Sequence, residues 1–227
     1  MTPAHQAPGR GDHEVEAWGL RVLRPSHPEL RRLRGRLRPQ RQGHRAWNAT
    51  WLLVDYLVHY PPPAGARVVD VGCGWGLVGI FCARRFAARV TGVDADARVF
   101  PYLQIHTRLN GVEVETLRAS FEEVPEGLLA PAHVLVGADI CFAPGMVQPL
   151  RRLLGRALAC GTRRVVLADP GRPAFRQLAA CCVDELGAAE REWEAAEPLV
   201  DWPGAAPRIR GRLLLAGAAS GNERSTP

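Results

Sequence analysis

A glycine-rich segment with one carboxylate is the part of this chain best suited to bind a ligand. It reads Val68-Val69-Asp70-Val71-Gly72-Cys73-Gly74-Trp75-Gly76. The β-branched run predicts a strand, and the alternating glycines predict a tight turn into a helix, where backbone can approach a ligand closely. The next predicted strand ends in Asp94, 22 positions after Gly72, and a carboxylate at this spacing can accept both hydroxyls of a ribose. The pattern predicts a cofactor that contains adenosine.

The charge of Asp70 narrows the choice of cofactor. A dinucleotide places its pyrophosphate at the helix N-terminus, and a carboxylate there would repel it. Leu77 also stands where the dinucleotide motif has its third glycine. S-adenosylmethionine has no phosphate and carries an ammonium and a sulfonium, so Asp70 suits it. We therefore expect S-adenosylmethionine and methyl transfer; the alternative is a strand-to-helix turn that binds no ligand.

Composition places few limits on function. All 29 basic residues are arginine and the net charge is +6, a pattern that fits a GC-rich genome and gives only weak support for a nucleic-acid partner. The six cysteines form no C-x-x-C pair and no spacing typical of a metal site, so we expect reduced thiols in a cytoplasmic protein and no metal. The sequence shows no signal peptide and no apolar run long enough for a membrane span.

Predicted strands and helices alternate along most of the chain, which is typical of a mainly parallel sheet covered on both faces. Expected strands cover residues 68–71, 89–93, 112–118, 133–138 and 163–168, with candidate edge strands near 193–199 and 208–216. Expected helices cover residues 46–60, 77–86, 97–109, 146–159 and 174–186. This predicts an α/β, Rossmann-like, seven-stranded sheet with an antiparallel C-terminal edge hairpin.

Three segments are expected from composition. Residues 1–44 are predicted to be a mobile, arginine-rich N-terminal arm, with seven arginines between Arg31 and Arg45; such a run binds RNA or an acidic protein, or is simply solvated. Residues 45–218 are predicted to form the catalytic domain, and residues 219–227 a disordered tail.

The ends of the predicted strands bring further polar residues together, since open α/β sheets bind ligands beyond the carboxyl ends of their strands. An acidic strand end often caps the next helix, and this is the alternative for Asp169. Asp139-Ile140-Cys141-Phe142 follows the fourth strand. A carboxylate can orient an amine there while an aromatic ring closes one side, which favours N-methylation. The paired prolines of base-amine methylases and the Pro-Cys of cytosine C5 methylases are missing.

Several motifs together resemble the class I, seven-β-strand protein-lysine methyltransferases. They are the segment from Val69 to Gly79, Asp139-x-x-Phe142 and Asp169-Pro170-Gly171-Arg172, with Trp47 and Trp51 upstream. The similarity is greatest to the group with the electron-transfer-flavoprotein β-subunit lysine methyltransferases and nicotinamide N-methylase-like bacterial proteins. It covers roughly residues 45–215.

The resemblance implies S-adenosylmethionine as donor, a protein lysine as acceptor and a last strand that is antiparallel. It implies catalytic roles for Asp139 and Phe142, and contacts to the cofactor from Trp51, Asp70, Gly72, Gly74, Asp94, Ser120 and Phe121. Asp139 is expected to orient the amine rather than act as a strong base, since a carboxylate stabilises the charged form of lysine. A small amine or RNA as acceptor, and a non-catalytic S-adenosylmethionine-binding subunit, remain as alternatives.

Overall fold

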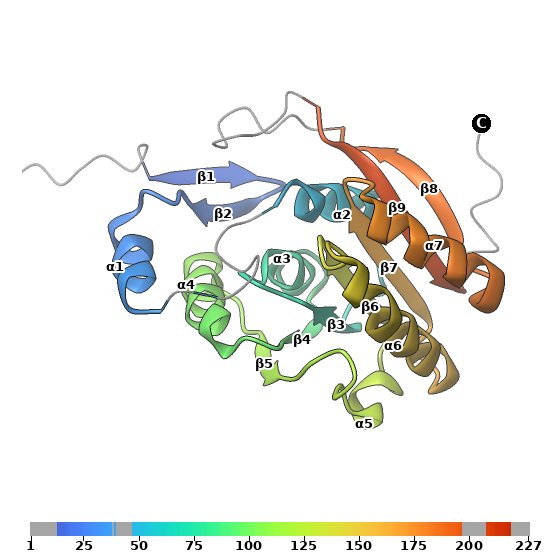
Figure 1. Cartoon of the computed structure of the whole chain (residues 1–227). Coiled ribbons are helices and arrows are strands. Elements are labelled where there is room, and N and C mark those ends of the chain that lie inside the picture. The colour runs from blue at the N-terminus through green and yellow to red at the C-terminus, as the bar shows by residue number, and fades with distance from the viewer. Residues whose placement is uncertain (1–12, 38, 40–46, 197–207, 219–227) are drawn as a thin grey trace, which may run out of the picture.

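The computed structural model describes residues 13–37, 39, 47–196 and 208–218. Within them, one seven-stranded sheet has the order β5-β4-β3-β6-β7-β9-β8 (Figure 1). The strands from β3 to β7 are parallel, and β9 pairs antiparallel with both β7 and β8. This confirms the predicted Rossmann-like sheet and its C-terminal hairpin. The strands are β3 (Arg67–Val71), β4 (Arg89–Asp94), β5 (Glu115–Arg118), β6 (Val134–Ala138), β7 (Arg164–Asp169), β8 (Ala189–Glu194) and β9 (Arg210–Gly217).

Helices cover both faces of the sheet (Figure 1). One apolar core lies between the sheet and α2 (Asn48–His59), α3 (Leu77–Phe86) and α4 (Phe100–Asn110). The other lies beneath α5 (Glu126–Leu129), α6 (Val147–Ala159) and α7 (Pro173–Leu186). Alternate residues of β3 face alternate cores, because successive side chains of a strand point to opposite faces. Val68 therefore packs in the first core and Val69 in the second.

Several element boundaries differ from the predictions. The strand expected over 112–118 covers only Glu115–Arg118, because Gly111 ends α4 in the left-handed conformation and the Val112 N–H then donates to the Thr107 carbonyl. The helices expected from 97 and 146 begin as 3₁₀ turns, Ala97–Val99 and Pro144–Met146. β8 lies earlier than expected, at Ala189–Glu194; residues 197–199 are outside the described part.

The prediction of a mobile arm is wrong for residues 13–37, which we call the N-terminal module. Strands β1 (Glu14–Ala17) and β2 (Leu20–Leu23) form a hairpin, followed by helix α1 (Pro28–Arg36). Trp18 and Gly19 turn the hairpin with positive φ angles. The indole of Trp18 stacks on Trp51 of α2, with ring centroids 5.5 Å apart. These buried contacts attach the module to the first core. The remaining residues of the predicted arm, and the 219–227 tail, lie outside the described residues.

A buried carboxylate joins the two ends of the chain to α2. Asp55 accepts hydrogen bonds from the indole N–H groups of Trp18 at 3.4 Å and Trp193 at 2.9 Å, and from the backbone N–H of Ala196 at 3.1 Å. Trp18 belongs to the N-terminal module and Trp193 to β8. Asp55 therefore ties the module, α2 and the C-terminal hairpin into one body. In the described residues, no helix is long and apolar enough to cross a bilayer.

Candidate active site

A cavity of about 830 Å³ lies at the carboxyl ends of the parallel strands. It extends across the junction of β3 and β6, where the chain passes to helices on opposite faces of the sheet, the usual ligand site in this architecture. Its volume is in the range of small-molecule sites. All but one of the sequence-predicted site residues line it: Asp70, Gly72, Gly74, Asp94, Ser120, Phe121, Asp139 and Phe142.

The glycine loop after β3 forms one wall. Gly72, Gly74 and Gly76 have φ angles of +63°, +53° and +71°, in the left-handed region that favours glycine. A Cβ atom on Gly72 would lie 2.5 Å from a methyl carbon of Ile140. Glycine at position 72 is thus required both by backbone conformation and by the close approach of the loop after β6. This leaves backbone N–H groups and little side-chain volume at the cavity wall.

Asp70 is buried at the end of β3, below the glycine loop. Its Oδ2 accepts a hydrogen bond from the Gly79 N–H at 3.1 Å, in the first turn of α3. Burial raises the pKa of Asp70 to about 7; the Gly79 hydrogen bond lowers it and the charge of Asp94 raises it. The carboxylate is therefore poised to ionise fully when a cation enters the cavity.

Asp94 organises the next part of the wall. One carboxylate oxygen accepts from the Gly74 N–H at 3.1 Å, and the other from the Asp96 N–H at 2.9 Å. A carboxylate has about four acceptor positions, so it can accept more hydrogen bonds than these two. Asp94 thus orients the glycine loop and can also accept from a diol.

An aromatic stack supports the glycine loop from behind. The Trp75 indole lies 5.8 Å from the Tyr102 ring and 5.0 Å from the His106 imidazole, in nearly parallel planes. Tyr102 and His106 lie on α4, one turn apart. Trp75 also lines the cavity, so α4 and the cavity wall share one packed unit.

The loop after β6, next to the glycine loop, contributes Asp139 and Phe142 to the cavity wall. Asp139 has a φ of +64°, a conformation uncommon outside glycine, and its N–H donates to the Ala168 carbonyl at 2.9 Å. Its side chain is largely buried. Because the backbone turns so sharply after β6, the carboxylate stays at the wall rather than passing into the following loop.

Asp139 is paired with an arginine from the neighbouring strand end. Nη2 of Arg172 contacts Oδ1 of Asp139 and lies 2.9 Å from Oδ2 of Asp169. The other oxygen of Asp169 accepts from the Gly171 and Arg172 N–H groups, both at 2.8 Å, so the Asp-Pro-Gly-Arg turn fixes the arginine. Arg172 does not line the cavity. It contacts Asp139 from outside the cavity, and among the described residues the second carboxylate oxygen of Asp139 has no ion-pair partner.

The prediction that Trp51 contacts the cofactor is corrected by the structure. Its side chain is buried against Trp18 in the first core, and the cavity is lined by Trp47 and Thr50, from the start of the same helix. Sequence reasoning also missed Arg98 and Met146 in the wall. Arg98 could have been suspected, because it follows Asp94 by four residues, directly after β4. Met146 carries no signal in the sequence.

Comparison with known proteins decides the family of the domain that carries this cavity. Residues 68–154 match the family model described as a methyltransferase domain. These residues, less than half of the chain, therefore match a methyltransferase domain. S-adenosylmethionine is its cofactor, as predicted, and the residues around the cavity fit that molecule: carboxylates at both ends, a glycine wall, and no requirement for phosphate binding.

The relatives of this methyltransferase domain act on different substrates. The ribosomal protein L11 methyltransferase of Shewanella piezotolerans is 35% identical over 86 residues, which is 38% of this chain and 27% of the relative. The ubiquinone biosynthesis O-methyltransferase of Albidiferax ferrireducens is 32% identical over 120 residues, 53% of this chain and 44% of the relative. The chain thus spans less than half the length of these curated relatives.

A solved structure shares the fold. The plantazolicin methyltransferase BpumL, in complex with SAH and a desmethyl substrate analogue, gives a TM-score of 0.53 at 13% identity, with 85% of this chain and 92% of that chain covered. Within the described residues, no group of three or more metal-binding side chains occurs.

Proposed function

We propose that the protein is an S-adenosylmethionine-dependent N-methyltransferase whose acceptor is a lysine side chain of a protein. The observation that carries this proposal is that a carboxylate, Asp139, and an aromatic ring, Phe142, line the cofactor cavity together in the loop after β6. Met146 and Pro149 extend the lining with apolar surface. A charged or polar amine on an apolar stem, as in lysine, matches this arrangement.

The rest of the wall supports an arrangement for the bound cofactor. We infer that Asp70, Gly72 and Gly74 hold its methionine part, that Asp94 accepts the ribose hydroxyls, and that Ser120 and Phe121 flank the adenine. This order follows the wall from β3 to β5, and it directs the methyl group toward β6 and Asp139. When bound, S-adenosylmethionine supplies a methyl group on a good leaving group.

Asp139 then aligns the acceptor nitrogen for in-line displacement. A bare carboxylate would favour the protonated, unreactive ammonium, but Arg172 shares the charge of Asp139 and weakens that effect. Phe142 closes one side and excludes water. The acceptor proton leaves to solvent, and no covalent bond to the protein is needed.

The pH dependence of cofactor binding tests the role of Asp70. Since the pKa of Asp70 in the empty site is raised to about 7, the carboxyl is protonated below that pH and must lose its proton to pair with the cationic cofactor. Affinity should therefore rise between pH 5.5 and 7, by up to about tenfold per unit, below the range where the α-amino group of the cofactor titrates. Calorimetry in two buffers of different ionisation heat should detect proton release. Asp70→Asn should remove both effects; an unchanged pH profile would contradict this role.

The class of acceptor is tested by labelling a lysate with tritiated S-adenosylmethionine and the purified protein. We expect label in material that survives ribonuclease and is lost on protease treatment. Label that is sensitive to ribonuclease would favour RNA, and label only in the low-mass fraction would favour a small amine. Cofactor binding without any labelling would favour the non-catalytic subunit. The Shewanella relative, named for ribosomal protein L11, supports a protein acceptor, whereas the ubiquinone relative supports the small-molecule alternative.

A further inference from the structure

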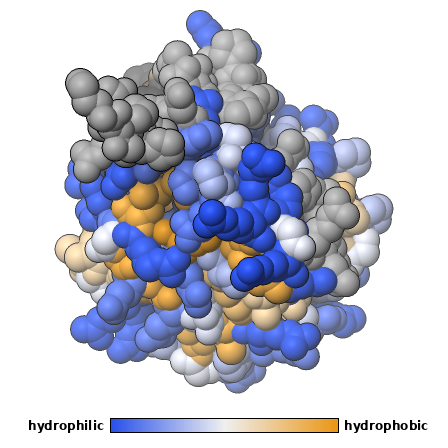
Figure 2. Space-filling view, turned by 90° about the vertical axis from the view of Figure 1, so that its left-hand side faces the viewer, coloured by the Kyte–Doolittle hydropathy of each residue, from blue (hydrophilic) through white to orange (hydrophobic). Residues whose placement is uncertain are grey.

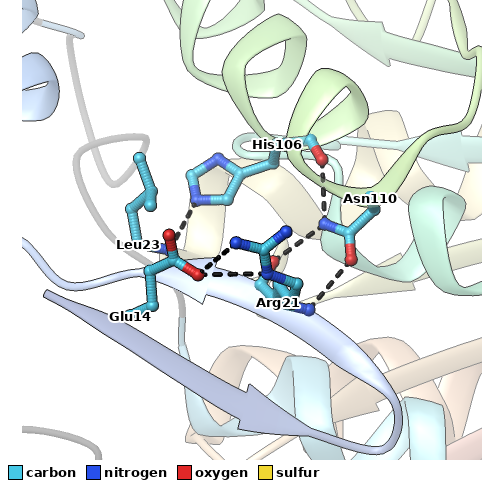
Figure 3. Close-up of polar contacts among 5 residues, drawn as sticks. All are labelled: Glu14, Arg21, Leu23, His106 and Asn110. Carbon is cyan, nitrogen blue, oxygen red and sulfur yellow. Dashed lines mark hydrogen bonds and ion pairs between the residues drawn. The ribbon is translucent and has the colours of Figure 1, made fainter. Parts of the chain in front are cut away.

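The N-terminal module is fixed to α4 by hydrogen bonds, as Figure 3 shows. The Asn110 side chain accepts from the Arg21 N–H at 2.9 Å and donates to the Arg21 carbonyl at 2.8 Å, so it pairs with β2 as a neighbouring strand would. Nε2 of His106 accepts from the Leu23 N–H at 3.3 Å. Burial lowers the pKa of His106 to about 4, which keeps the imidazole neutral and able to accept near neutral pH. The same imidazole stacks on Trp75 of the cavity wall.

Helix α1 lies alongside α4 (Figure 1). At its start, Glu29 pairs with Arg108 near the end of α4, at 3.4 Å. After its last turn, the Leu37 carbonyl accepts from the Tyr102 hydroxyl near the start of α4, at 3.0 Å. The two helices are therefore antiparallel. Arg98, which lines the cavity, lies four residues before Tyr102, about 6 Å along a helix axis.

The outer face of α1 is basic and unpaired. Leu30 is buried and Leu33 packs on the first core, whereas Arg31, Arg32 and Arg36 are exposed. In the described part of the chain these three arginines form no ion pair. Arg32 and Arg36 are one turn apart, where like charges destabilise a helix. Figure 2 shows that hydrophilic residues cover most of this side of the molecule. The repulsion between these arginines destabilises α1, and an anionic partner bound to this face would reduce that repulsion.

The charge of the cavity selects between anionic partners. Among the described residues, five carboxylates line it, Asp70, Asp94, Asp96, Glu122 and Asp139, against two arginines, Arg98 and Arg118. A nucleic acid drawn to α1 would carry its phosphates to this acidic opening. A protein with an acidic segment beside its methylated lysine matches both charges, since the acidic segment meets α1 and the ammonium meets the cavity.

We propose that the exposed arginine face of α1, formed by Arg31, Arg32 and Arg36, is a docking surface for an acidic segment of the methyl-acceptor protein. The inference rests on the proposed function. The docked module places this face at a fixed position relative to the cavity, so it raises the local concentration of the acceptor lysine without touching the reacting atoms.

The test compares two triple variants with equal loss of charge. One is R31Q/R32Q/R36Q; the control is R67Q/R89Q/R163Q, which changes three exposed arginines at the amino ends of β3 and β4 and just before β7, away from the cavity. We expect the α1 variant to label the acceptor protein in lysate at least tenfold more slowly at low salt, with unchanged S-adenosylmethionine affinity and no loss of melting temperature. The control should stay within twofold of the unmodified chain. Raising the salt should slow the unmodified chain and leave the α1 variant nearly unchanged, because screening removes only the attraction that α1 supplies.

A binding measurement separates this inference from the proposed function. Fluorescence anisotropy with a labelled oligoglutamate peptide and with oligouridylate needs no acceptor. We expect the chain to bind the peptide more tightly than it binds the RNA. The α1 variant should bind the peptide at least tenfold more weakly than the unmodified chain. Tighter binding of RNA, or equal losses in the control, would overturn the docking surface even if a protein is labelled. Peptide binding through α1 with no labelled protein would instead contradict the lysine acceptor.

Discussion

Replacing Asp139 with asparagine is expected to lower the rate of methyl transfer about 100-fold or more, since removing a single preorganised polar group from an active site costs on this order. The affinity for S-adenosylmethionine should change less than about threefold, because we assign this side chain to the acceptor amine and not to the cofactor. The variant should thus lose methyl transfer while it still binds the cofactor. The matched control is Asp184→Asn, which neutralises an exposed carboxylate on α7.

Measurement requires labelling kinetics with the lysate acceptor and calorimetry with the cofactor. Arg172→Gln should give a smaller loss of rate, because Asp139 keeps its charge but loses the guanidinium that holds it, and Arg172→Lys should restore part of the rate. If cofactor affinity fell as much as turnover in Asp139→Asn, this residue would belong to the cofactor site or to folding. A drop in melting temperature equal to that of Asp169→Asn would point to folding.

The sequence predicted the sheet well because its signals are local. Val68–Val71 is an apolar run with a glycine turn directly after it, and such a pattern needs no distant contact to be recognised. The carboxylates Asp70, Asp94 and Asp139 were found for the same reason: each follows a strand, and parallel strands bring their ends to one edge. Their convergence on one cavity follows from topology alone.

The N-terminal module could not be predicted because its stability depends on distant contacts. Its strands have four residues each, and short hairpins are marginal without packing. The packing comes from Trp51, His106 and Asn110, which lie 33 to 89 positions away from their partners in the module. A long run of arginine hid this, because charge patterning suggested solvent exposure. The pairing of Arg172 with Asp139 was missed for a related reason. The two residues follow different strands, and the sequence alone does not show that their side chains meet.

Replacing Asp94 with alanine is expected to weaken the binding of S-adenosylmethionine by roughly 10- to 100-fold, the range for losing hydrogen bonds to a charged acceptor. Two effects act together. The ribose hydroxyls lose their acceptor, and the Gly74 N–H loses the oxygen that orients the glycine loop. Asp94→Asn should lose less, because its amide oxygen can still accept from Gly74.

The demethylated product contains the same ribose, so Asp94→Ala should bind it more weakly by a similar factor. Calorimetry with both ligands checks this. NAD should not compete with either, since Asp70 opposes its pyrophosphate. Asp184→Asn again serves as the control and should leave both affinities unchanged. Unchanged donor binding in Asp94→Ala, or tight binding of NAD to the unmodified chain, would place the ribose elsewhere in the cavity, and the order assigned from β3 to β6 would then have to be reversed or abandoned.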